Sequence, residues 1–165
     1  MAVQTGAFMA QEQYMIKRVP ANIETAALTL TANATQQDWP IITALNTALA
    51  RDGVVVHAPR GVVGERPIHI LSVTTGDAPV ATHGRYLIVA DENSQVTVVE
   101  THVTVASGAY LTNPVTEIVA AANANVDHYR VQAESADGHH VGSVHTWGGR
   151  DSVTSTHTLS VGDGL

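Results

Sequence analysis

The stretches NSQVTVVE (Asn93–Glu100), NANVDHYR (Asn123–Arg130) and RDSVTSTH (Arg150–His157) share one outline, a polar turn followed by a strand. The second follows the first after thirty residues, and the third follows after twenty-seven. A repeat at such a period is typical of solenoids, propellers and arrays. Two or three strands in each period, with no helix between them, favour a parallel β-helix, in which each coil lies about 4.8 Å above the last.

Aligning the repeats predicts which residues of neighbouring coils touch. Glu100 falls over Arg130, so opposite charges lie side by side. The other predicted columns are Val96, Val126 and Val153; Val89, Val119 and Thr146; and Asn93 over Asn123. An antiparallel sandwich is the alternative fold, since short strands with turn signals fit it too. The matching columns favour the solenoid.

Side-chain alternation raises one difficulty within this scheme. Val96 and Val98 share one face of their strand, and Glu100 continues on that face. A bulge or corner near Val99 would relieve the conflict.

Short β-rich runs begin at Val54 and are separated by residues typical of turns. The predicted strands are 54–58, 68–73, 86–90, 96–103, 115–121, 126–132, 141–146 and 153–161. We therefore predict a mainly β chain, a right-handed parallel β-helix over residues 53–165.

Residues 1–52 differ from the rest, and we predict that they form a short helical N-terminal cap. One helix is expected over Gln11–Arg18 and a second over Asp38–Ala50, with Asp38 as the cap and Pro40 in the first turn. Ile41, Leu45 and Leu49 fall on one face of the second helix, as expected of a packing face.

Composition excludes several classes of function. The chain has 165 residues, enough for one domain, and a formal net charge of -7 with Lys17 as its single lysine. No basic stripe is present, so we expect neither nucleic-acid nor anionic-membrane binding. The apolar runs are shorter than a membrane span requires, no signal peptide opens the chain, and there is no cysteine. A cytoplasmic location is expected.

Four segments resemble, in order, the core domain of the SufB/SufD family of iron–sulfur cluster assembly proteins. They are Ile42–Val62, Arg85–Glu100, Tyr110–Ser135 and His139–Leu165, and they include NPVTEIV and GRDS. The helix entry ALNTALARDG makes the chain more similar to SufD than to SufB. The resemblance implies a right-handed parallel β-helix and a non-enzymatic scaffold for cluster assembly. It also implies pairing through the β-helix with a SufB/SufD-like partner, and recruitment of the SufC ATPase.

The chain also departs from the family pattern. Family members are longer, with further coils and a C-terminal helical segment that docks the ATPase, whereas this sequence stops at SVGDGL, as in a truncated form. The cysteine and histidine positions implicated in cluster handling have no match here. We therefore expect no cofactor in this chain, with an iron–sulfur cluster only in the full assembly, and we assign no catalytic, cofactor-binding or metal-binding residue.

Nine histidines invite a metal hypothesis that the spacing does not favour. His140 and His145 have opposite parity, and His139 lies about 20 Å from His145 along an extended strand. In the alignment His145 falls over Ile118, His128 over Ser155 and His157 over Arg130, so no histidine stacks on another. A diagonal approach of His128 and His157 would give a cluster of two ligands at most.

Three further patterns in the sequence resemble catalytic or phosphate-binding motifs. Glu117 and Asp127 would have to form the paired carboxylates of a carbohydrate-cleaving β-helix, the alternative function, yet they belong to different strands. HTWGGRDS (145–152) contains the residue types of a Ser/His/Asp triad but is better explained by a tight turn followed by an Arg150–Asp151 surface pair. GVVGER (61–66) lacks the lysine of a phosphate loop and is predicted to be a turn.

The final predicted coil suggests an interaction. A solenoid that ends at Leu165 exposes strand edges and an open end. We therefore expect self-association through SVTSTHTLSV (152–161), or else a purely structural solenoid module.

Overall fold

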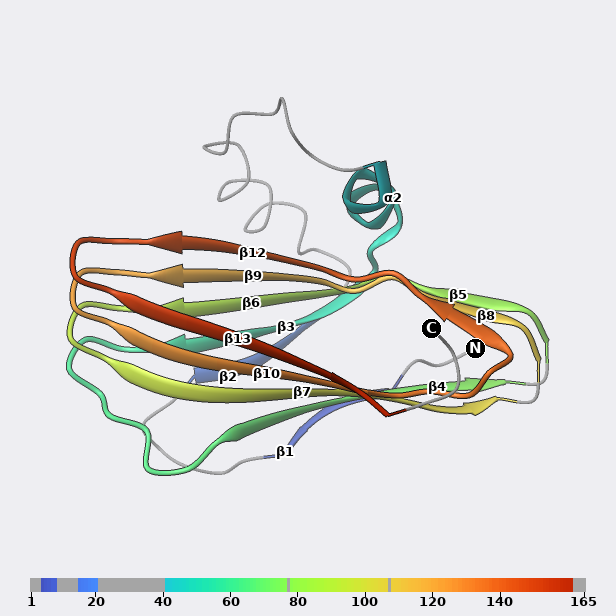
Figure 1. Cartoon of the computed structure of the whole chain (residues 1–165), viewed down its shortest axis with the longest axis horizontal. Helices are drawn as coiled ribbons and strands as arrows, with labels where there is room; N and C mark the ends of the chain where they lie inside the picture. Colours follow the sequence, from blue (N-terminus) through green and yellow to red (C-terminus); the bar gives the residue numbers. More distant parts are fainter. Residues whose placement is uncertain (1–3, 9–14, 21–40, 77, 107, 162–165) are drawn as a thin grey trace.

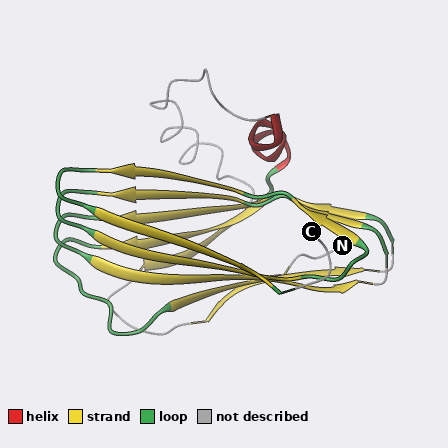
Figure 2. Cartoon of the chain, viewed as in Figure 1, coloured by secondary structure: helices red, strands yellow, loops and turns green. Residues whose placement is uncertain are grey.

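The computed structural model describes residues 4–8, 15–20, 41–76, 78–106 and 108–161, and these form a parallel β-helix of stacked coils (Figures 1 and 2). Sheet A contains, in spatial order, β1 (Gln4–Phe8), β4 (Ile68–Gly76), β7 (Gln95–Ala106), β10 (Asn125–Ala133) and β13 (Val153–Ser160). Sheet B contains β12 (Ser143–Gly148), β9 (Val115–Ala120), β6 (Gly84–Ala90), β3 (Asp52–Ala58) and β2 (Met15–Pro20). Sheet C contains β11 (Gly138–His140), β8 (Tyr110–Thr112) and β5 (Val80–Thr82).

The coils stack in the predicted register up to the last one. Val126 pairs with Val96, as expected, but its partner in β13 is Thr154, so the final step is twenty-eight residues and not twenty-seven. Val153 pairs with Asn125 and is 60% exposed. The predicted third member of the valine column is therefore wrong, because a slip of one residue turns every side chain to the opposite face.

The turns between the sheets explain why the spacing predicted for the last repeat is one residue too short. Asn93, Asn123 and Asp151 each have a φ near +58° (59°, 57° and 58°), the left-handed conformation that Asn and Asp tolerate. Asp151, rather than Arg150, thus occupies the position equivalent to Asn123. The predicted stacking of the two asparagines is confirmed by a hydrogen bond of 3.2 Å from Asn123 Nδ2 to Asn93 Oδ1.

Two antiparallel strands cover the first coil. β1 pairs with β4 and β2 pairs with β3, whereas the other pairings between the described strands are parallel. The predicted helix over Gln11–Arg18 is wrong for its second half, since Met15–Arg18 belongs to β2, and residues 11–14 lie outside the described part. Pairing with the edge of β3 outweighs the weak local helix preference. The proposed division between residues 52 and 53 stays a prediction.

The helix α2 (Ile41–Leu49) packs on sheet B with the face opposite to the predicted one (Figure 1). Thr43 and Asn46 are fully buried, whereas Leu45 is 36% and Leu49 46% exposed. Polar groups on the outer face of sheet B hold this helix, and so the apolar spacing did not identify its buried side. Asp38 and Pro40, the predicted cap and first-turn residues, lie outside the described part.

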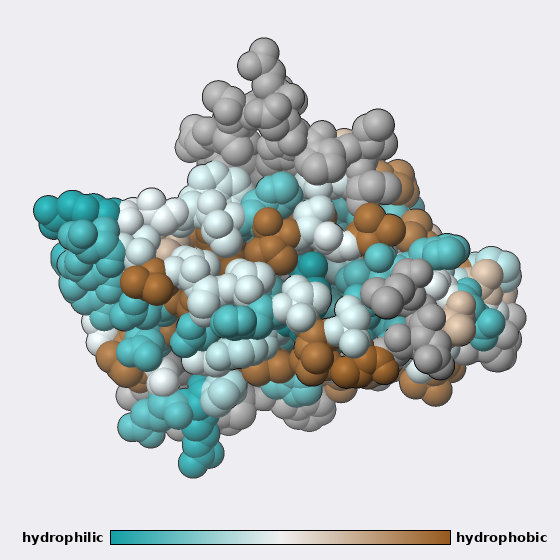
Figure 3. Space-filling view, in the orientation of Figure 1, coloured by the Kyte–Doolittle hydropathy of each residue, from teal (hydrophilic) through white to brown (hydrophobic). Residues whose placement is uncertain are grey.

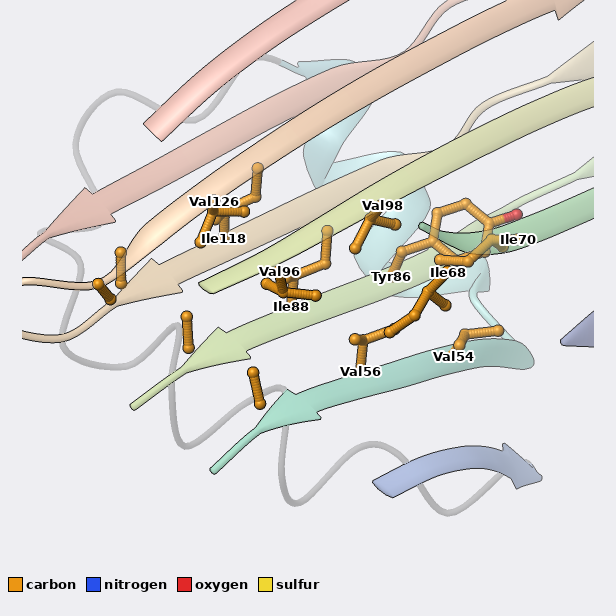
Figure 4. Close-up of a cluster of buried hydrophobic side chains, with 14 residues drawn as sticks. Val54, Val56, Ile68, Ile70, Tyr86, Ile88, Val96, Val98, Ile118 and Val126 are labelled. Carbon is orange, nitrogen blue, oxygen red and sulfur yellow. The ribbon is translucent and has the colours of Figure 1, made fainter. Parts of the chain in front are cut away.

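The apolar core fills the part of the lumen next to the turns that join sheet B to sheet A. Figure 4 shows its side chains converging from both sheets. The cluster consists of Val54, Val56, Ala58, Ile68, Ile70, Tyr86, Ile88, Ala90, Val96, Val98, Ile118, Ala120, Ala124 and Val126. The turns themselves are hydrophilic on the outside, as the left end of Figure 3 shows. Among the described residues no helix is long and apolar enough to cross a membrane.

Candidate functional site

The apolar lumen gives way to a polar centre at Glu100. β7 runs from Gln95 to Ala106 in one piece, so neither a bulge nor a corner interrupts it near Val99, and Glu100 continues the inward face of Val96 and Val98. Its side chain is completely buried, at 0% exposure. A buried carboxylate is costly unless it is paired and hydrogen-bonded, so its partners determine whether this coil is stable.

Four side chains donate to the Glu100 carboxylate. His102 Nε2 lies 2.6 Å and Arg130 Nε 3.0 Å from Oε1, while Thr116 Oγ1 lies 2.7 Å and His128 Nε2 3.0 Å from Oε2. The predicted Glu100–Arg130 pair is thus confirmed. Burial raises the pKa of Glu100, but Arg130 and the hydrogen bonds from the histidines outweigh it and hold that pKa well below its usual range. The carboxylate is therefore ionised inside the lumen.

A second carboxylate lies beside the first centre. Glu134 is 3% exposed and accepts hydrogen bonds of 2.6 Å from Thr112 Oγ1 and 2.6 Å from His140 Nδ1. Burial raises its pKa, and the hydrogen bonds from His140 and Thr112 more than compensate, so the pKa of Glu134 is lowered. The rings of His102 and His140 contact each other edge to face, with centroids 4.9 Å apart. The two carboxylate–histidine units are therefore continuous.

A third polar group joins α2 to the outside of sheet B. Arg85 forms a buried ion pair with Glu117 and donates to Asn46 Oδ1 at 3.2 Å and to Thr47 Oγ1 at 3.1 Å. Asn46 Nδ2 in turn donates to the carbonyl oxygens of Asn113 (2.7 Å) and Gly84 (3.0 Å). Burial lowers the pKa of Arg85 to about 10. This group fixes the helix to the solenoid.

The histidine prediction fails in its details. His128 points into the lumen, whereas His157 lies outside, stacked on Tyr129 with ring centroids 5.0 Å apart, so the two cannot share a ligand. In the corrected register His157 pairs with Tyr129, His128 with Thr156 and His145 with Glu117. Within the described residues no group of three or more His, Cys, Asp or Glu side chains is arranged to hold a metal ion.

The other candidate patterns are separated by the fold. Glu117 is buried against Arg85 on sheet B, while Asp127 lies on β10 in sheet A and accepts from Ser155, so the two carboxylates do not face one substrate. Ser152 Oγ donates to Gly149 O at 2.8 Å and closes the predicted tight turn. Arg150 and Asp151 form the predicted exposed pair, with Nε and Oδ2 3.5 Å apart. Residues 61–66 form a turn that leads into β4 and not into a helix.

Sequence reasoning missed His102, His140 and Glu134 as members of one centre. The signal was present for the first of these, because His102 lies two residues after Glu100 and so shares its face. Glu134 and His140 lie on either side of residues 135–137, where no alternation applies. Their contact follows only from the position of the short strand β11, which was not predicted.

Comparison with known proteins shows which family this sequence matches. Residues 72–165 match the profile described as SUF system FeS cluster assembly, SufBD core domain, and residues 9–70 match the SufBD protein N-terminal region. An iron–sulfur cluster assembly SufBD family protein of Synechocystis is 34% identical over 109 residues. That alignment covers 61% of this chain and 24% of the relative, so the chain spans about a quarter of the relative's length.

Proposed function

Since this chain belongs to the SufBD family of iron–sulfur cluster assembly proteins, we propose that it is a non-enzymatic scaffold component that pairs through its β-helix with a SufB/SufD-like partner. The partner would be a second solenoid whose coils continue the same sheets. The SufC ATPase would bind to the resulting pair. The cluster would be cargo of the full assembly, and this chain would hold no cofactor of its own.

The observation that supports this proposal is the outer edge of β13 in the described part of the chain. Among the described strands β12 pairs only with β9, and β13 pairs only with β10. On the side of β13 that faces β10, the backbone amides of Val153 and Val161 donate to Ala124 O (2.9 Å) and Gln132 O (2.8 Å). Because amides alternate along a strand, those of Thr154, Thr156, Thr158 and Ser160 face the open side. They form a row of donors suited to a further parallel strand.

The buried charges support a scaffold over a hydrolase. Glu100, Glu117 and Glu134 are at most 3% exposed, and each is bonded to side chains of the chain itself. A carboxylate in that position has no free face for a polysaccharide. We also propose that the chain is SufD-like, which the resemblance of its helix entry supports. A cytoplasmic location is part of the proposal too, and the family supports it.

A single substitution tests the pairing. Thr156→Pro removes a backbone amide that faces the open edge of β13. The hydrogen bonds between β13 and β10 stay intact, and an edge strand accepts proline in that position. Thr156→Val keeps the amide and serves as the matched control. We expect the Val variant to co-purify with SufB and SufC as the unchanged chain does, and the Pro variant to lose most of the bound partner. Equal recovery of both variants, or retention of neither partner by the unchanged chain, would contradict the proposal.

The same variants test self-association. If residues 152–161 join two copies, light scattering will report a dimer or larger species for Thr156→Val and a monomer for Thr156→Pro. A monodisperse monomer for the unchanged chain at high micromolar concentration would exclude self-association. It would not contradict pairing with a SufB/SufD-like partner.

A further inference from the structure

We propose that a water molecule binds beside Gly142, at the corner between β11 and β12, and bridges Arg130 to His140. It completes a hydrogen-bonded network that runs Glu100–Arg130–water–His140–Glu134, from sheet A to sheet C. The inference rests on the described side chains and is independent of the proposed partners.

His140 presents one buried nitrogen that the chain itself does not satisfy. Its Nδ1 is bonded to Glu134 at 2.6 Å, and its ring packs edge to face on His102, so the ring has a fixed orientation. The side chain of His140 is 5% exposed, and its Nε2 is buried without a hydrogen-bond partner in the described part of the chain. Such atoms are rare in native structures, and ordered water is a common partner for them.

Arg130 brings a hydrogen-bond donor to the same place. Its Nε is bonded to Glu100, and its Nη2 is bonded to Thr116 Oγ1 and Ser143 O, so the plane of the guanidinium group is fixed. Nη1 takes part in none of these three bonds. Its N–H groups can therefore donate to a further acceptor.

The two nitrogens approach one point because residue 142 is a glycine. A Cβ atom on Gly142 would lie 2.7 Å from Arg130 Nη1 and 3.0 Å from His140 Nε2. A water oxygen close to this point can bond to both nitrogens at about 2.7–3.2 Å. The equivalent position in the preceding coil is Pro114, so it is the last coil that lacks a side chain here. Gly142 is exposed, which gives water a route to the site.

The chemistry of the site favours water over an ion. Glu134 is ionised, because its pKa is lowered, so it can only accept and His140 Nδ1 carries the proton. In a neutral ring Nε2 is then an acceptor, and one water molecule accepts from Arg130 Nη1 while it donates to Nε2. The positive charge of Arg130 repels a cation. Glu100 and Glu134 disfavour an anion, since each is bonded to one of the two side chains that form the site.

A high-resolution crystal structure of the chain tests the site. We expect a density peak at about 2.7–3.2 Å from both Arg130 Nη1 and His140 Nε2, in copies whose Gly142 does not touch a neighbouring molecule. Crystals soaked in bromide identify the ligand, because a bound halide gives an anomalous signal at this position and water does not. A missing peak, or an anomalous one, would overturn the proposal.

Two matched glycine substitutions connect the peak to the space at residue 142. Gly142→Ala places a methyl group beside the two nitrogens, and we expect the peak to disappear. Gly148→Ala adds the same group at the exposed end of β12, where it meets Ser152 Oγ, and the peak should persist. A peak that keeps both contacts in folded Gly142→Ala would also overturn the proposal. If that variant does not fold, the peak and the bromide soak of the unchanged chain decide.

Discussion

Replacing Arg130 by methionine removes the arginine that is bonded to the fully buried carboxylate of Glu100. Arg130 is 5% exposed, and it donates to Glu100 Oε1 at 3.0 Å, to Thr116 Oγ1 at 2.8 Å and to Ser143 O at 3.4 Å. Breaking a buried pair by deleting one partner costs about 3–5 kcal/mol, because the other charge stays buried and less well compensated. We expect the free energy of unfolding at pH 7 to fall by that amount.

The double variant Arg130→Met/Glu100→Gln isolates the charge. It removes both ions together, and neutral replacements of similar volume are often tolerated without loss. We expect it to recover more than half of the stability that the single variant loses, although Gln can accept fewer hydrogen bonds than the carboxylate. Urea unfolding followed by circular dichroism gives both values. A loss below about 1 kcal/mol for Arg130→Met, or a double variant no more stable than the single one, would refute the reasoning.

The pH dependence has a definite sign. In the unchanged chain the pKa of Glu100 is lowered on folding, so this carboxylate stabilises the fold above its unfolded value of about 4.3, and the stabilisation is lost progressively as the pH falls below that value towards the lower folded pKa. Without Arg130, burial is opposed by the hydrogen bonds alone and the pKa of Glu100 rises. The difference in stability between the two chains should therefore narrow as the pH falls from 7 to about 4.

Three further experiments probe other parts of the fold. Ile118→Ala, at a fully buried core position, should lower the free energy of unfolding by about 2–5 kcal/mol, whereas Leu159→Ala, at 56% exposure, should change it by less than about 0.5 kcal/mol in urea titrations. Asn123→Ala should cost about 1 kcal/mol at its positive φ of 57°, while Asn123→Gly should not, and a smaller difference between the two in thermal melts would contradict the turn assignment. Asn46→Ala removes the bonds to Gly84 O and Asn113 O, so amide hydrogen exchange in Ile41–Leu49 should accelerate at least tenfold without a matching change in β9.

The repeat in the sequence was sufficient to predict the stack but not its last register. Thirty-residue spacing placed Val126 on Val96 and Arg130 on Glu100 correctly. For the last coil, the alignment matched Val153 to the inward valines of the earlier coils, although the side chain of Val153 points to solvent. In that coil the inward positions of β13 carry Thr154, Thr156 and Thr158, so hydrophobicity no longer marks the inside.

The candidate site was hidden by the assumption that a solenoid lumen is apolar. Alternation correctly places Glu100 on the inward face, whereas a bulge or corner near Val99 would have turned it away from the lumen. Instead, four hydrogen-bond donors on three strands compensate the buried charge of Glu100. Nothing in the sequence around two of these donors, Thr116 and His128, indicates that they contact Glu100. Similarly, α2 exposes Leu45 and buries Asn46 because it packs on Arg85 and Glu117, and such tertiary contacts cannot be read from helix periodicity.

The antiparallel strands at the first coil give the tube a direction of growth. β1 and β2 pair antiparallel with the first-coil strands of sheets A and B, and a parallel coil cannot continue that pairing in these two sheets. In sheets A and B, further parallel strands can therefore add only on the side of β13 and β12. This is also the order in which the ribosome delivers the chain, so each coil can serve as the template for the next one during synthesis.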